Sequence, residues 1–274
     1  MRSVLIFVVP VVVPTGLARF VASSTRVVAI IPARYRSTRF PGKPLAVIGG
    51  RTMIEHVYRR VEQARRVDAY FVATDDERIA EAVDRFGGVA IMTRDDHETA
   101  TDRLAEVAAE LPAELIVNVQ GDEPLISPDA IDAAVGLMFD RPEAGIGTLR
   151  RKVEDPADLD NPHVVKVVVD REGFGLYFTR AAIPFLSSGK PRPTFWKHIG
   201  LYVYRRDFLL KLASMTPTAL ERAEGLEQLR VLENGFRIAT VETDVDTIGV
   251  DTPADLAKVR ELIEARTASP GVTS

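Results

Sequence analysis

The feature that most constrains the fold is a regular alternation of short apolar runs with amphipathic stretches, which begins at residue 26. Short β-branched and apolar runs predict strands, whereas apolar positions three or four residues apart predict helices. This alternation is typical of an α/β domain with a largely parallel or mixed sheet. The predicted strands are 27–31, 69–73, 89–92, 115–119 and 146–149, and the predicted helices are 53–65, 77–86, 102–111 and 128–139.

The second half adds a β-rich part. Strand-like runs lie at 164–170, 174–179 and 198–204, with a hairpin turn at 171–173, and helices are predicted at 226–233 and 254–265. The stretch 184–196 lacks periodicity and is rich in Pro, Gly and Ser, which predicts a surface loop, either a mobile lid or a dimer contact. Without internal repeats, we expect one domain over 26–266 with a β-rich insertion, and a disordered tail over 267–274.

Residues 1–25 differ from the rest of the chain and are interpreted as an N-terminal extension. An early arginine, an apolar run and small residues near Ala22 resemble a secretory signal. Pro10 and Pro14 interrupt the apolar run, which is too short to span a bilayer as a helix. A start codon set too far upstream would explain the same residues, and composition alone does not separate the two explanations.

Charge and cysteine content exclude several functions. The net charge of −4 argues against wholesale binding to nucleic acid or to an acidic membrane, because those partners need a basic face. The 274-residue sequence has no cysteine, which excludes disulfides, thiolate metal sites and cysteine nucleophiles. Positive charge is therefore expected to be concentrated in particular segments of the chain.

One such local concentration follows the first predicted strand. Its four cations lie within ten positions: Arg34, Arg36, Arg39 and Lys43. Three prolines stiffen the loop, so its cations lose little entropy when they bind an anion. Neither a Walker loop nor a dinucleotide fingerprint is present. A solvated basic loop is the simple alternative, but the density of charge directly after a strand favours a polyphosphate ligand.

Two acidic clusters lie at comparable positions. Gln120, Gly121 and Asp122 follow a predicted buried strand, where Gly121 permits close backbone approach and Asp122 could meet a metal and a phosphate. Ser127 is the better cap for the following helix, which leaves Asp122 available. Asp251 precedes a helix N-terminus and, taken alone, is interpreted as a cap. Together the clusters match the needs of magnesium and a triphosphate, whereas Asp244 to Asp246 is interpreted as a polar loop.

Seven motifs resemble, in order and spacing, the 3-deoxy-manno-octulosonate (Kdo) cytidylyltransferases, also called CMP-Kdo synthetases. The resemblance runs from about residue 26 to about residue 265. CMP-sialic acid synthetases and the cytidylyltransferases of the isoprenoid pathway have Gly-rich openings that this chain lacks. The motifs are IIPARYRSTRFPGKPL, VATDDERI, MTRDDHETATDRLAEV, IVNVQGDEPLI, HIGLYVYRRDFL, LEQLRVLENG and GVDTPADL.

The resemblance implies a nucleotidyltransferase-type three-layer α/β/α fold, with a mixed, mostly parallel sheet and a small β-rich dimerisation insertion. It also implies transfer of CMP from CTP to Kdo, giving CMP-Kdo and pyrophosphate, with Mg²⁺ as cofactor. This reaction activates Kdo for lipopolysaccharide synthesis. A cytoplasmic homodimer is expected, without nucleic acid or stable membrane association, and the use of a cytosolic nucleotide favours the misplaced start codon over a signal.

The resemblance also implies roles for individual residues. Arg34 and Lys43 would hold the CTP phosphates and, with Asp122, act in catalysis, while Asp122 and Asp251 would bind the metal. Contacts to the nucleotide are further implied for Thr74, Asp75, Gln120 and Gly121. Contacts to the sugar acid are implied for Gln120, His198, Tyr202, Glu227 and Gln228. Arg180 could meet the Kdo carboxylate, although an exposed ion pair is an equally good interpretation.

One departure from the family pattern concerns the segment 97–103. The family usually has His-x-Ser-Gly-Thr-Asp/Glu-Arg, where this chain has His97-Glu98-Thr99-Ala100-Thr101-Asp102-Arg103. An alanine is strained where a glycine adopts positive φ, so Ala100 leaves the shape of this loop open. A related sugar acid, an amino-Kdo analogue or a sialic-type acid, therefore stays an alternative substrate. A non-catalytic nucleotide-binding homologue would be expected to lack Asp122, Asp251 or Lys43, which are all present.

Overall fold

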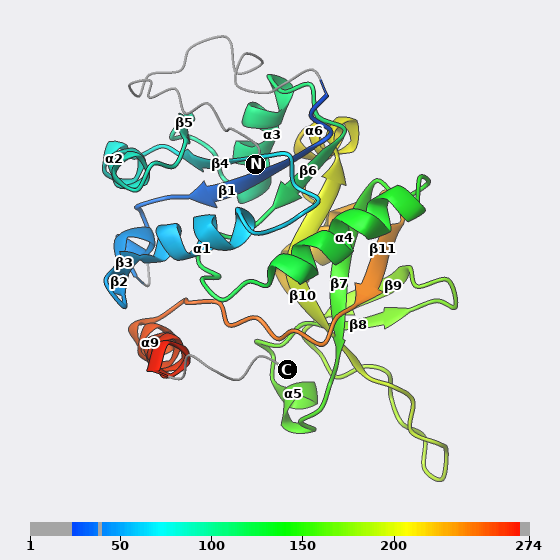
Figure 1. Ribbon diagram of the computed structural model, residues 1–274. Helices are drawn as coiled ribbons and strands as arrows, with labels where there is room; N and C mark the ends of the chain where they lie inside the picture. Colours follow the sequence, from blue (N-terminus) through cyan, green and yellow to red (C-terminus); the bar gives the residue numbers. More distant parts are fainter. Residues whose placement is uncertain (1–23, 38–39, 269–274) are drawn as a thin grey trace.

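The computed structural model describes residues 24–37 and 40–268, and these form a mixed sheet between two layers of helices (Figure 1). Most of the expected N-terminal extension, residues 1–23, lies outside the described residues. Seven strands follow one another across the sheet in the order β11 (Ile238–Glu242), β7 (Ile146–Lys152), β10 (Trp196–Arg205), β6 (Leu115–Asn118), β1 (Val27–Ala33), β4 (Ala69–Thr74) and β5 (Ala90–Met92).

Strand β10 gives the sheet its mixed character. It runs antiparallel to both neighbours, β6 and β7, whereas β1, β4, β5 and β6 are mutually parallel and β11 is parallel to β7. The start of β10 therefore lies at the same sheet edge as the carboxyl ends of the parallel strands. A hairpin of β8 (Lys166–Val169) and β9 (Gly175–Thr179) pairs with this start and confirms the predicted turn at 171–173.

Alternating side chains of the strands pack into two separate hydrophobic cores. In β1, Val27, Ala29 and Ile31 face one core and Val28 and Ile30 face the other. The first core is covered by α1 (Met53–Val61), α2 (Glu77–Arg85) and α4 (Pro128–Asp140). The second is covered by α3 (Ala100–Ala109), α6 (Arg206–Ala213) and α8 (Gln228–Glu233). Burial on both faces explains why the strands read as continuous apolar runs, and it confirms the three-layer α/β/α architecture.

Side chains define several helix ends that differ from the prediction. Helix α1 ends at Val61 rather than at 65, because the carboxylate of Asp132 accepts the backbone N–H groups of Arg65 and Arg66 at 3.1 and 2.8 Å. Helix α3 begins two residues earlier than expected, behind a capping box formed by Thr99 and Asp102. Ser127 occupies the N-cap position of α4 as predicted, but its side chain makes no capping hydrogen bond.

Among the described elements of four or more residues, four were not predicted from the sequence: α5 (Ala157–Asp160), α6, α7 (Ala219–Glu224) and β11. Helix α6 begins at the residue directly after β10, so no turn residue separates the two patterns. The others have four to six residues, which is too short for a clear period. Within the described residues, no helix combines the length and apolar character needed to cross a membrane.

The C-terminal helix α9 (Pro253–Ala268) packs beside the loop that follows β1. That loop contains the short 3-10 helix η2 (Lys43–Leu45) and the strands β2 (Val47–Ile48) and β3 (Arg51–Thr52). Ile48 and Val259 belong to one small apolar cluster, and the Arg260 guanidinium donates twice to the carbonyl of Val47, at 2.8 and 3.0 Å. The helix extends past the predicted end at 265 into the expected tail, of which 269–274 lie outside the described residues.

Candidate active site

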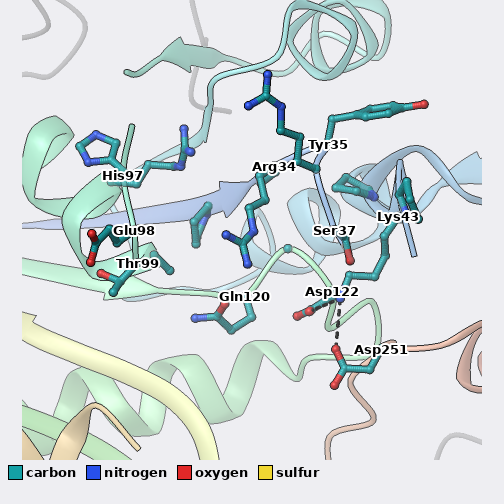
Figure 2. A pocket seen from close by; sticks show the side chains of 18 residues that line it. Arg34, Tyr35, Ser37, Lys43, His97, Glu98, Thr99, Gln120, Asp122 and Asp251 are labelled. Atoms are coloured by element: carbon teal, nitrogen blue, oxygen red, sulfur yellow. Dashed lines mark hydrogen bonds and ion pairs between the residues drawn. The ribbon is translucent and has the colours of Figure 1, made fainter. Parts of the chain in front are cut away.

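A cleft of about 820 Å³ opens at the carboxyl edge of the parallel strands (Figure 2). Three segments far apart in sequence form its walls: the loop after β1, the residues leading into α3, and the loop after β6. Asp251, just before α9, completes the lining. Ligands of open α/β sheets bind in such a position, where loops and helix N-termini converge.

The loop after β1 is held in a compact turn. Gly42 adopts φ of 71° and donates its N–H to the carbonyl of Tyr35 at 2.9 Å, and Pro44 is buried in the turn of η2. Arg34 and Arg36 are exposed and line the cleft, whereas Arg39 lies outside the described residues. Lys43 also lines the cleft, with a side chain that is only 13% exposed. The sequence thus brings three of its four expected cations to one cavity.

Lys43 lies between two carboxylates. Its Nζ donates to Asp122 at 2.6 Å and to Asp251 at 3.4 Å, and Figure 2 shows the three side chains converging. A backbone hydrogen bond of 2.9 Å from Val250 to the Asp122 carbonyl joins the two segments. The side-chain cap of α9 comes from Thr252 rather than from Asp251. The Thr252 hydroxyl accepts the backbone N–H of Asp255 at 3.2 Å, and the Thr252 backbone N–H donates to the Asp255 carboxylate at 2.8 Å. The interpretation of Asp251 alone as a cap is therefore wrong.

The geometry of these carboxylates suits a magnesium ion. Two carboxylates reach one cation from different loops, and Mg²⁺ is usually held by one or two carboxylates together with substrate phosphates and water. Over the described ranges, no group of three or more His, Cys, Asp or Glu residues is arranged to hold a metal by itself. The donor set fits a metal that arrives with a phosphate ligand better than it fits a permanently bound structural ion.

Gly121 allows the loop after β6 to touch the end of β1. A Cβ at this position would lie 2.7 Å from the carbonyl oxygen of Pro32, which is closer than real side chains approach backbone. The predicted close approach is therefore made to the protein's own backbone. Its neighbour Gln120 donates to the side chain of Asn118 at 3.0 Å and lines this cleft and a second one.

The second cleft, of about 480 Å³, adjoins the first at Ala100 and Gln120. Its walls come from the start of β10, the first turn of α3, the residues around the start of α8, and the loop after β11. Four residues predicted to contact a sugar acid line it, in addition to Gln120: His198, Tyr202, Glu227 and Gln228.

His198 is an uncharged ring in this cleft. Its Nε2 lies 2.9 Å from the hydroxyl of Thr148, and Phe178 packs edge-on at a centroid distance of 5.2 Å. Burial lowers the pKa of His198 from 6.5 to about 3, so the imidazole is neutral near pH 7. Burial also raises the pKa of Tyr202, which keeps its hydroxyl protonated. Both side chains can therefore act as hydrogen-bond partners of a polar ligand.

Two polar atoms of this cleft are buried without a hydrogen-bond partner: Oε1 of Glu227 and Nε2 of Gln228. Nearly all buried polar groups of folded proteins are satisfied, so a pair of unsatisfied atoms in a cavity wall is an exception. Burial raises the pKa of Glu227, while a hydrogen bond from Thr101 and the charge of Arg230 act in the opposite direction. The two unsatisfied atoms themselves have almost no solvent-exposed surface, so it is the rest of each side chain that lines the second cleft.

Three predicted site residues do not line either cleft. Thr74 is fully buried, and its hydroxyl accepts the N–H of Asp76 at 3.2 Å. Asp75 forms an ion pair of 3.2 Å with Arg103, which does line the first cleft. The guanidinium of Arg180 donates to the carbonyls of Glu224 and Pro162 at 2.8 and 2.9 Å.

Sequence reasoning missed other lining residues. Lys197, the sole Lys or Arg among the described residues that line the second cleft, pairs with Asp246 at 2.8 Å and with Asp158 at 3.2 Å. The loop at 244–246 was treated as merely polar, yet Asp246 lines this cleft. The segment from His97 to Ala100 lines the first cleft, and its dense polar composition before a helix was the available signal. Ala100 begins α3 in helical backbone, so it replaces a glycine without strain.

Comparisons with known proteins agree with this geometry. The family model for cytidylyltransferases matches residues 28–239. A 3-deoxy-manno-octulosonate cytidylyltransferase of Pelobacter propionicus is 54% identical over 249 residues, covering 87% of this chain and 98% of the relative. One of Geobacter sulfurreducens is 55% identical over 248 residues, covering 87% of this chain and 99% of the relative.

Solved structures show the same relationship. The structure of CMP:2-keto-3-deoxy-manno-octonic acid synthetase complexed with CTP superposes with a TM-score of 0.84 at 44% identity, covering 88% of this chain and all of that one. A 4-diphosphocytidyl-2C-methyl-D-erythritol synthase from Anaerococcus prevotii shares only the fold, with 13% identity, a TM-score of 0.56, and coverage of 88% of this chain and 99% of that one. The chain therefore belongs to the cytidylyltransferase family and, within it, to the 3-deoxy-manno-octulosonate cytidylyltransferases.

Proposed function

We propose that this chain transfers CMP from CTP to Kdo, giving CMP-Kdo and pyrophosphate. The observation that carries the proposal is the pair of adjoining clefts, which meet at Gln120. The first is lined by several cations and by carboxylates that include Asp122 and Asp251, and the second is lined mostly by uncharged and acidic polar groups together with Lys197. This arrangement provides separate places for a triphosphate and a sugar acid. The relatives named above support the identity of both substrates.

In the first cleft, Arg34 and Lys43 hold the phosphates of CTP and offset the charge that develops on the leaving pyrophosphate. The anomeric hydroxyl of Kdo attacks the α-phosphorus in line with the departing pyrophosphate. Chemistry of this kind depends mostly on positioning and electrostatics, so a covalent nucleophile is unnecessary. Gln120, which lines both clefts, lies where the two substrates would meet.

Asp122 and Asp251 hold magnesium in this proposal. When bound with the triphosphate, the ion neutralises phosphate charge and lowers the pKa of a coordinated hydroxyl. The two carboxylates contribute the negative charge that attracts the ion. When the ion is not bound, Lys43 bridges the carboxylates at 2.6 and 3.4 Å and limits their mutual repulsion. Gly121 keeps Asp122 at its place by letting the loop after β6 rest on the end of β1.

The second cleft receives the sugar acid. The carboxylate of Glu227 accepts a sugar hydroxyl, and the side-chain amide of Gln228 donates to a sugar oxygen. Tyr202 and His198 line the same cleft and add further hydrogen-bonding groups. We leave Arg180 out of this site, because its guanidinium is engaged with two backbone carbonyls.

A second candidate function is cytidylyl transfer to a related sugar acid, such as an amino-Kdo analogue or a sialic-type acid. The observation that favours it is Ala100, whose position lines both clefts where the family usually has glycine. A methyl group between the nucleotide and the sugar acid would change the space available to the sugar substituents.

We further propose that the enzyme acts in the cytoplasm as a homodimer and that its product is used for lipopolysaccharide synthesis. Its nucleotide substrate supports the compartment. Support for the dimer comes from apolar side chains on the surface of the insertion, where Phe185 is 89% and Leu176 is 61% exposed. Light scattering of the purified protein measures the assembly, and a monomer at micromolar concentration would contradict it.

The decisive experiment measures pyrophosphate release from each of the four NTPs against a panel of 2-keto sugar acids. We expect release with CTP and Kdo, and preference for another acid of the panel would favour the second candidate. Asp122→Asn should lower turnover by about a hundredfold or more, while the fold and its melting temperature stay near wild type. The matched control is Asp129→Asn, whose carboxylate is 81% exposed in a surface ion pair and should not matter. No release with CTP and Kdo would refute the proposal.

A further inference from the structure

Thr101 connects α3 to the residue before α8 through a hydrogen bond to which the proposed reaction gives no role. Its side chain is almost completely buried, with 1% exposure, and its hydroxyl donates to Oε2 of Glu227. The two residues are 126 positions apart in the sequence. Thr101 belongs to the first turn of α3, whereas Glu227 directly precedes α8, and both residues line the second cleft.

This hydrogen bond fixes the orientation of the Glu227 carboxylate in the wall of the second cleft. Oε2 is taken by Thr101, while Oε1 is buried without a hydrogen-bond partner. The nearest cation, Arg230, lies 3.6 Å from Oε1, but its guanidinium is already bound by both oxygens of Glu221, from Nε at 2.8 Å and from Nη2 at 2.5 Å. Thr101 is the one side chain among residues 24–37 and 40–268 that donates a hydrogen bond to the Glu227 carboxylate, so its loss would free that carboxylate to rotate.

Thr101 itself is held firmly. The capping box fixes the first turn of α3, since the Thr99 hydroxyl accepts the N–H of Asp102 at 3.1 Å and the Asp102 carboxylate accepts the N–H of Thr99 at 3.0 Å. Thr99 lines the first cleft and Ala100 lines both. The same helical turn that borders the nucleotide cleft therefore carries the hydroxyl that orients a carboxylate in the sugar cleft.

We infer that Thr101 is a positioning residue for the sugar acid: its hydroxyl holds the Glu227 carboxylate in the orientation in which it accepts a sugar hydroxyl. This inference rests on the proposed function, because it assigns Glu227 to the Kdo cleft. Thr101 touches neither substrate in this role and acts through the carboxylate, while its hydroxyl is also a hydrogen-bond partner of Tyr204. It also makes the sugar cleft sensitive to the position of the α3 N-terminus, which borders the nucleotide.

Thr101→Val tests the inference, because valine keeps the shape of the side chain and removes the hydroxyl. A hydrogen bond to a charged group contributes enough that its loss should raise KM for Kdo by about ten- to one-hundredfold, with KM for CTP within about twofold of wild type. Thr101→Ser restores the hydroxyl and should restore KM for Kdo. The pH profile gives a second readout, because loss of the donor raises the pKa of Glu227 and moves the acid limb of kcat/KM for Kdo to higher pH.

Thr240→Val is the matched control. Thr240 is also a buried threonine, and its hydroxyl donates to the carbonyl of Gly173 at 2.7 Å, away from both clefts. It should leave both KM values and the pH profile unchanged, and a thermal melt of each variant shows that the fold persists. If wild type releases pyrophosphate and Thr101→Val keeps the wild-type KM for Kdo and acid limb, the inference is wrong. If wild type releases none, the proposed function fails instead.

Discussion

Replacing Gly121 by alanine would push the active-site loop off the end of β1. The new Cβ would lie 2.7 Å from the carbonyl oxygen of Pro32, a backbone atom in a central strand that cannot rotate away. Relieving this contact needs a shift of several tenths of an ångström, and such overpacking costs about 1–3 kcal/mol. For a domain of this size, that corresponds to a fall in Tm of about 2–12 °C.

The same substitution in α4 provides the control. Gly136 lies in the helix interior, and a Cβ there would come no closer than 3.8 Å to the side chain of Arg66. Gly136→Ala should therefore raise stability by up to about 1 kcal/mol, because alanine is the better helix former. One chemical change is thus expected to have opposite signs at two positions.

Thermal unfolding of both variants and pyrophosphate release by Gly121→Ala test this reasoning together. Gln120 and Asp122 flank the substituted position, and displacement of reacting groups by about 1 Å can lower turnover by about a hundredfold. A Gly121→Ala protein that melts with wild type and turns over at the wild-type rate would show that the loop accommodates the methyl group freely. The close approach of the loop after β6 to β1 would then be unimportant for stability and turnover.

Three further outcomes are expected. Lys166→Met should lower Tm by several degrees and raise KM for Kdo. The buried ammonium donates to the carbonyls of Asn161, Val164 and Arg180, and it thereby holds the loop 161–165, part of which lines the second cleft; an unchanged melt would contradict this. His198 is neutral when folded, because burial lowers its pKa to about 3, so the protein loses stability as pH falls below 6.5. In urea melts, the unfolding free energies of wild type and His198→Gln should converge by at most about 1.4 kcal/mol per pH unit. A difference that stays constant from pH 7 to 4 would refute the neutral ring. Asp251→Asn should keep the fold and weaken magnesium binding measured by calorimetry, whereas wild-type affinity would remove it from the metal site.

Much of the fold was predictable because its signals are local. The buried runs of β1, β4 and β6 and the apolar stripes of α1 and α4 carry their periods within single segments, and the α/β architecture follows from their alternation. The reversal of β10 was not predictable in this way. Strand direction depends on which neighbours a segment meets, and no residue of β10 encodes that by its own preference.

The candidate site was predictable to the extent that its residues end predicted strands. Arg34, Lys43, Gln120 and Asp122 all lie in the loops that follow β1 or β6, so their meeting follows from parallel pairing. Thr101 and Lys197 were missed, since each looks like an ordinary member of a helix or a strand. Their roles come from partners, Glu227 and Asp246, that only the folded chain brings near.

The hydrogen bond between Lys43 and Asp251 joins residues 208 positions apart, from the loop after β1 to the segment before α9. Because domains are synthesised from the N-terminus, the sheet strands β1, β4 and β6 exist well before Asp251 leaves the ribosome. A growing chain therefore has the basic loop but lacks one of the two carboxylates. On the proposed function, full stabilisation by nucleotide and metal is therefore expected only for the finished protein, in which both carboxylates are present.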